Sequence, residues 1–97
     1  MAKAKKSLFT ISDQSMDFLR TYMNTASPVG SESAGQKVWL NNIKNYVDNT
    51  FTDPYGTAVG VINPGKSFKV VIEAHADEIS WFVNYITAEG FIYLKRN

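Results

Sequence analysis

With 97 residues the chain can form one small domain at most, and its lack of cysteine excludes disulfides and thiolate metal sites. Ten basic and nine acidic side chains give a net charge of +1, which argues against a dominant attraction to nucleic acid or anionic membranes. No stretch approaches the roughly 18 apolar residues of a membrane-spanning helix, and no apolar segment follows the basic start as in a signal peptide, so we expect a cytoplasmic protein.

The first predicted element is a helix that follows a basic N-terminal segment. Residues 1–9 show no clear pattern, which predicts a flexible terminus rather than a nucleic-acid-binding arm. Apolar side chains recur at helical spacing over residues 11–23, where Phe18 and Tyr22 form an i, i+4 pair. Ser12 is placed to cap this helix, because its hydroxyl can accept from the free N–H groups of the first turn.

A second helix is predicted after a break in the chain. Pro28 and Gly30 favour extended and turn geometry and therefore end the first helix. Residues 33–48 then show a second apolar face at helical spacing. Ser33 and Gln36 have the spacing of a capping box at its start.

Beyond residue 49 the pattern changes to strand-like runs. Residues 57–62 and 68–75 are two such runs, and the turn sequence at 63–66 between them predicts an antiparallel hairpin. Residues 79–86 and 91–95 form a third and a fourth run with a turn between them. The predicted fold class is α/β, with two helices followed by a β-hairpin and further strands.

Several other positions are interpreted as structural. Asp53-Pro54-Tyr55-Gly56 has the chemistry of a turn, and Gly60 inside a strand-like run indicates a bulge or close packing. Trp39 and Trp81 each lie in an apolar periodic run, which favours packing over ligand stacking.

The run Val70-Val71-Ile72 is typical of a strand that is covered on both faces of a sheet. Two helices and a few strands can hardly cover both faces. We therefore expect the chain to be the front piece of a longer protein, and on its own to be prone to self-association through uncovered apolar surface.

The chemistry of the chain is concentrated in "EAHADEIS", residues 73–80. In a continuous strand Glu73, His75 and Asp77 would share one face, with about 7 Å between neighbours at i and i+2. The carboxylate could orient the imidazole, whose free nitrogen could bind a divalent ion. Glu78 would point to the opposite face, unless the chain bends there. A hydrogen-bonded structural histidine is the alternative for His75, since one histidine cannot complete a zinc site of about four ligands.

Over a longer stretch the sequence resembles the glutamyl-aminopeptidase or tetrahedral-aminopeptidase family of dinuclear-metal exopeptidases, some of which carry old labels as cellulases or endoglucanases. The resemblance spans roughly residues 16–95. Its specific part is "AHADEIS…YITAEGFI", which is similar to the family pattern Ala-His-x-Asp-Glu-Ile-Gly followed by a strand and a Gly-Phe-Ile turn.

The resemblance implies roles for three residues. His75 matches the family's first metal ligand, Asp77 matches the acid that orients it or supports the catalytic centre, and Glu78 matches the adjacent family acid. Ser80 departs from the family glycine, which bears on the local backbone and leaves the metal ligand unchanged.

The resemblance also implies an organisation and an activity. Residues 10–78 would be the N-terminal part of the catalytic domain, and residues 79–97 would open an inserted β dimerisation domain. The full-length parent would be a homo-oligomeric metallo-aminopeptidase that removes N-terminal residues from peptide substrates with two divalent metal ions, zinc or cobalt. The segment alone would hold no metal and would be inactive, because the other ligands and the glutamate base lie later in such chains.

Two other classes of function are weighed against this one. The first is a stand-alone α+β interaction module that derives from a peptidase front end and has no catalysis. The second, a sugar hydrolase, needs two carboxylates about 5–10 Å apart across a cleft, and the neighbouring Asp77 and Glu78 do not supply such a cleft.

Overall fold

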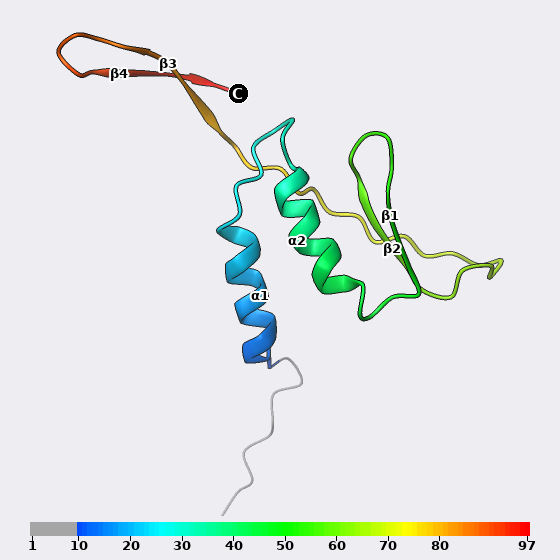
Figure 1. The fold of residues 1–97 in the computed structure, drawn as a ribbon. Coiled ribbons are helices and arrows are strands. Elements are labelled where there is room, and N and C mark those ends of the chain that lie inside the picture. The colour runs from blue at the N-terminus through cyan, green and yellow to red at the C-terminus, as the bar shows by residue number, and fades with distance from the viewer. Residues whose placement is uncertain (1–9) are drawn as a thin grey trace, which may run out of the picture.

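A computed structural model describes residues 10–97 (Figure 1). It contains two helices and two separate two-stranded antiparallel sheets, which confirms the α/β class. The elements are α1 (Asp13–Met23), α2 (Ser33–Ile43), β1 (Asn49–Thr52), β2 (Ala58–Val61), β3 (Trp81–Ile86) and β4 (Ile92–Arg96). The prediction for residues 1–9 lies outside the described residues.

Helix α1 begins where its cap predicts. Ser12 has an extended backbone, and its Oγ accepts a 3.1 Å hydrogen bond from the backbone N–H of Ser15. The rings of Phe18 and Tyr22 lie 6.0 Å apart between centroids, as expected for an i, i+4 pair. The helix starts at Asp13 rather than at residue 11, because the capping residue itself lies outside the helix.

Helix α2 is shorter than predicted, and the predicted capping box is wrong. The N-cap is Glu32, which makes no side-chain cap bond; its Oε1 accepts instead from the N–H of Gly30 at 2.6 Å. The helix ends at Ile43 rather than at residue 48. By Asp48 the chain has joined the β1–β2 ladder, since the Asp48 N–H donates to the Val61 carbonyl at 2.9 Å.

The first predicted hairpin is also wrong. Strand β2 pairs with β1, with Asn49 opposite Val61 and Thr52 opposite Ala58, and residues 68–75 form no strand. The loop at 53–57 explains the choice: Asp53 Oδ1 accepts from the N–H groups of Tyr55 and Thr57 at 2.9 and 2.8 Å. A short loop with its own hydrogen bonds closes a hairpin at little entropic cost.

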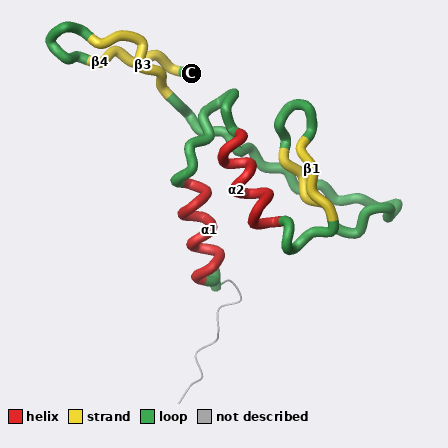
Figure 2. Tube along the Cα trace, in the orientation of Figure 1, coloured by secondary structure: helices red, strands yellow, loops and turns green. Residues whose placement is uncertain are grey.

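The second predicted hairpin is confirmed. Strands β3 and β4 pair from Trp81 opposite Arg96 to Ile86 opposite Ile92, with an irregular register near Val83. This hairpin projects away from the two helices (Figure 2). Its side chains are exposed on both faces, including that of Trp81, so the predicted packing of this residue is not met within residues 10–97.

Packing between the elements is sparse. Helix α2 rests on β2, where a Cβ at Gly60 would lie 3.3 Å from Val47 Cγ1 and 3.6 Å from the Trp39 ring, which confirms the predicted close packing. No apolar side chain of residues 10–97 is buried. The radius of gyration is 19.6 Å, whereas a compact domain of 100 residues has about 13 Å. Neither described helix is long and apolar enough to cross a membrane.

The run Val70-Val71-Ile72 is 75, 84 and 95% exposed and lies outside any strand, contrary to the prediction. A strand needs a neighbouring strand to accept and donate its backbone hydrogen bonds. Within residues 10–97, no such neighbour lies beside this run.

Candidate functional site

The segment that carries the histidine is fastened to the loop between the two helices. The Glu78 N–H donates a 2.8 Å hydrogen bond to the Ser27 carbonyl, and Pro28 and Glu78 form an isolated parallel bridge. A second link joins the same loop to the end of the chain, where Asn97 Nδ2 donates to the Val29 carbonyl at 2.8 Å. These bonds position residues 75–78 beside the C-terminal end of α1.

His75 and Asp77 contact each other directly. Their Nδ1 and Oδ1 atoms lie 3.1 Å apart, with 84% of the His75 side chain and 42% of the Asp77 side chain exposed. When Nδ1 carries the ring proton and donates it to Asp77, the Nε2 lone pair is left free for a metal ion or a proton. The carboxylate then fixes the tautomer and the orientation of the ring.

The other two acids take different positions. Glu73 is exposed and forms no hydrogen bond with this pair, so the predicted shared face of three residues is reduced to His75 and Asp77. The reason is that the continuous strand on which that prediction depended does not form. Glu78 is exposed and is held through its backbone by Ser27, next to the pair.

The site forms one side of a hollow of about 180 Å³. One wall comes from the end of α1 and the loop that follows it, and the other from the histidine segment. The lining residues are Tyr22, Met23, Thr25, Ser27, His75, Ala76, Asp77 and Glu78. The hollow is large enough for a small group, such as the end of a peptide or a hydrated ion.

Ser27 and Gly35 set the shape of this wall. Ser27 is only 3% exposed, and its Oγ has no hydrogen-bond partner. It packs against Gly35 of α2 so closely that a Cβ at that position would collide with Ser27 Oγ. The sequence analysis identified neither residue, because no spacing pattern in the sequence shows that a helical glycine leaves room for a residue of the preceding loop.

The described residues offer only a few possible metal ligands near His75. They contain no group of three or more His, Cys, Asp or Glu side chains that could hold a metal ion. His75 could supply one imidazole, and Asp77 or Glu78 a carboxylate, whereas zinc takes about four ligands. The donors among residues 10–97 are therefore too few for a zinc site.

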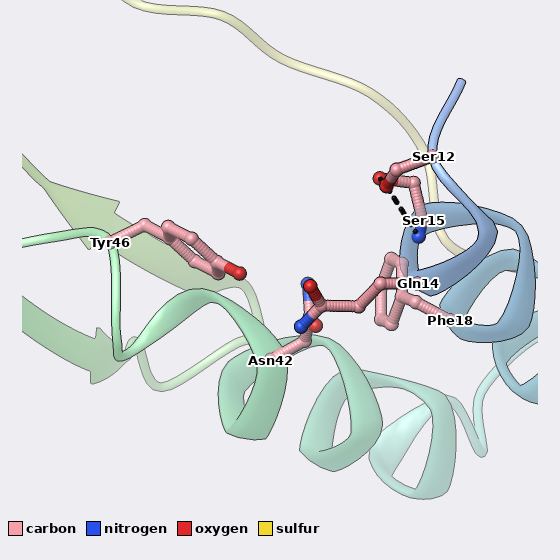
Figure 3. Close-up of a pocket in the computed structure, with 6 residues that line it drawn as sticks. All are labelled: Ser12, Gln14, Ser15, Phe18, Asn42 and Tyr46. Carbon is pink, nitrogen blue, oxygen red and sulfur yellow. Dashed lines mark hydrogen bonds between the residues drawn. The ribbon is translucent and has the colours of Figure 1, made fainter. Parts of the chain in front are cut away.

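A second hollow, of about 260 Å³, lies between the first turn of α1 and the C-terminal end of α2 (Figure 3). Its lining residues are Ser12, Gln14, Ser15, Phe18, Asn42 and Tyr46. These are amide, hydroxyl and aromatic groups without a carboxylate or an imidazole. We find no acid–base or metal chemistry there.

Comparison with known proteins points to peptidase-like hydrolases. The chain is 32% identical over 76 residues to a protein of Acetivibrio thermocellus named "Putative aminopeptidase", in a match that covers 78% of this chain and 23% of the relative. It is 23% identical over 82 residues to a protein of Thermococcus kodakarensis named "Putative LysW-lysine/LysW-ornithine hydrolase", covering 84% of this chain and 24% of that relative.

The chain therefore spans about a quarter of the length of these relatives. No protein-family model and no solved structure matches it. Both relatives carry hydrolase names and one is named as a peptidase, so the chain is similar to peptidase-like hydrolases.

Proposed function

We propose that the chain is the N-terminal segment of a metal-dependent aminopeptidase of the glutamyl- or tetrahedral-aminopeptidase type. The full-length parent would remove N-terminal residues from peptides, and the segment alone would be inactive. The observation that carries this proposal is the contact between His75 and Asp77, in a chain that is similar over 78% of its length to a relative named as an aminopeptidase.

In this proposal His75 binds one metal ion through Nε2, while Asp77 holds the ring through Nδ1. A carboxylate in this position orients the imidazole and raises its basicity. Two divalent ions, zinc or cobalt, would supply an activated water and polarise the scissile carbonyl. Glu78, whose backbone is fastened to Ser27, is the adjacent acid on the same wall.

The rest of the site would come from the remainder of the longer protein. The chain has a single histidine, and the described residues contain no group of three or more His, Cys, Asp or Glu side chains that could hold a metal ion. Residues 79–97, which form the projecting hairpin, would begin an inserted dimerisation domain, and the parent would be a cytoplasmic homo-oligomer. Peptides, rather than nucleic acid or membrane, would be its partners.

The alternative is a stand-alone α+β interaction module without catalysis. Such a module needs a core of its own, because apolar burial provides most of the free energy that opposes chain entropy. Residues 10–97 bury no apolar side chain. This observation favours the peptidase segment over the module.

Metal binding and peptide hydrolysis test the proposal together. In the full-length parent, His75→Ala should abolish release of the N-terminal residue from a peptide and lower the bound zinc measured by mass spectrometry, whereas Tyr55→Ala, in an exposed loop, should change neither. A variant His75→Ala with unchanged activity and metal content would contradict the proposal.

The inactivity of the segment is tested on the 97-residue chain itself. Calorimetry with zinc and with cobalt should detect no tight binding to the wild-type chain or to His75→Ala. Tight binding that is lost in His75→Ala would mean that the chain completes a metal site, and the prediction that the segment holds no metal would then be wrong.

A further inference from the structure

A glutamate that does not cap its helix lies in the loop that holds the histidine segment. Glu32 is the N-cap of α2, yet within residues 10–97 its side chain makes no cap hydrogen bond. Its Oε1 accepts instead from the Gly30 N–H at 2.6 Å. An N-cap side chain ordinarily accepts from an N–H of the first helical turn and so stabilises the helix. The Glu32 carboxylate therefore stabilises the loop in place of the helix end.

The loop that Glu32 stabilises contains a tight turn. The Ser31 N–H donates to the Pro28 carbonyl at 2.8 Å. Gly30, within this turn, has a positive φ of 81°, a conformation that glycine adopts without a steric penalty. The hydrogen bond from Gly30 to Glu32 joins the turn to the start of α2. The turn is therefore fixed both by its own hydrogen bond and by the Glu32 carboxylate.

The same turn begins at the residues that contact Glu78. The Ser27 carbonyl accepts from the Glu78 N–H at 2.8 Å, and Pro28 forms the isolated bridge with Glu78. The loop between α1 and α2 accordingly lies beside the segment that leads into β3 (Figure 1). Pro28 takes part in both arrangements, since its carbonyl closes the turn and its backbone pairs with Glu78. A displacement of the turn would therefore displace Glu78.

We propose that Glu32 is a positioning residue for residues 75–78 and acts through the turn at Pro28. This inference rests on the proposed function, in which Glu78 is the acid next to the metal ligand His75. Glu32 is not among the residues that line the hollow at His75. Its effect on the site is therefore transmitted by the backbone of the loop and does not involve contact with a substrate.

Three substitutions of Glu32 separate the reach of its side chain from its charge and its capping ability. Glu32→Gln keeps an oxygen at the same reach and removes the charge. Glu32→Asp keeps the charge and is a favoured N-cap residue, but it is one methylene group too short for the Gly30 N–H. Glu32→Ala removes all three properties. A positioning role makes Glu32→Asp resemble Glu32→Ala, whereas a role of charge or capping alone makes it resemble the wild type.

Hydrogen exchange measured by mass spectrometry on the full-length parent tests this order independently of activity. Glu32→Asp and Glu32→Ala should accelerate exchange of the Gly30 and Glu78 amides about fivefold, because each loses a hydrogen bond that restrains the turn. Glu32→Gln should change neither amide. The control is Asp17→Ala, which removes a carboxylate of α1 that accepts from Arg20 and should also change neither. Wild-type exchange of Glu78 in Glu32→Asp and Glu32→Ala would overturn the proposal, and so would equal acceleration in Glu32→Gln.

Peptide hydrolysis by the same variants tests the consequence for the reaction. Glu32→Asp and Glu32→Ala should lower kcat about tenfold with KM unchanged, since a displacement of about 1 Å at a site can cost up to about 100-fold in rate. Glu32→Gln should retain the wild-type kcat. In an active parent, a wild-type kcat in all three variants would overturn the positioning role. A parent without aminopeptidase activity would instead contradict the proposed function, and the exchange of Glu78 would still decide whether Glu32 holds this segment.

Discussion

The contact between Ser27 and Gly35 gives the sharpest test of how the candidate site is positioned. Ser27 is buried against the first turns of α2, and its carbonyl holds the Glu78 N–H at 2.8 Å. Replacing Gly35 with alanine places a Cβ in collision with Ser27 Oγ and 3.3 Å from Ser27 Cβ. We expect the loop to shift and the Glu78 hydrogen bond to weaken.

The magnitude follows from two opposing effects. Overpacking of a tight contact costs about 1–3 kcal/mol, whereas replacing glycine by alanine within a helix gains up to about 1 kcal/mol. The net loss should therefore be about 1 kcal/mol. In a Ser27→Ala background the colliding Oγ is absent, and Gly35→Ala should become neutral or slightly stabilising. Ser27→Ala alone should not destabilise, because the buried hydroxyl has no partner to lose.

Amide hydrogen exchange measured by NMR is the suitable assay, because it reports local opening at individual residues. Gly35→Ala should accelerate exchange of the Glu78 amide about fivefold, since about 1 kcal/mol corresponds to that factor. The Thr57 amide, in the separate β1–β2 loop, should be unaffected. If the Glu78 amide exchanges at the wild-type rate, or if Ser27→Ala fails to rescue, then the contact does not position the site.

Two further predictions concern local structure. Ser12→Ala removes the cap of α1 and should cost about 1 kcal/mol of helix stability, seen as lower helical circular dichroism; Ser12→Asp should retain the signal, and an equal loss in both variants would argue against capping. The backbone N–H of Thr57, followed by those of Tyr55 and Gly56, lowers the pKa of Asp53 below its ordinary value of 3.8. The stabilisation is therefore complete well above pH 3.8 and is lost as the pH falls through the lowered pKa. Protection of the Thr57 amide should decline in that acidic range in the wild type and not in Asp53→Asn; protection that does not change with pH would contradict this assignment.

Elements with local signals were predictable from the sequence. Ser12 caps α1 as expected, and the β3–β4 hairpin forms between the two predicted runs. In each case the residues that specify the structure lie within a few positions of one another. The chemistry of the Asp53 turn was also predicted, although its role in pairing β1 with β2 was not.

Partner choice between strands was not predictable in the same way. Residues 57–62 and 68–75 both have strand patterns and a turn sequence between them, yet β2 pairs with the preceding run at 49–52. A strand pattern specifies an extended backbone with two faces, and it does not specify which neighbour completes the ladder. The hydrogen-bonded loop at Asp53 favours the earlier partner.

The candidate site likewise has one part that local sequence determines and one part that depends on long-range packing. The sequence by itself determined the spacing of His75 and Asp77, because residues at i and i+2 of an extended segment are close enough for an imidazole to meet a carboxylate. Only the tertiary structure decided that Ser27 holds this segment and that Gly35 leaves room for it. The physical reason is that a side-chain pair two residues apart depends on local geometry, whereas a contact between residues 27 and 78 depends on how the loop, the helix and the distant segment pack together.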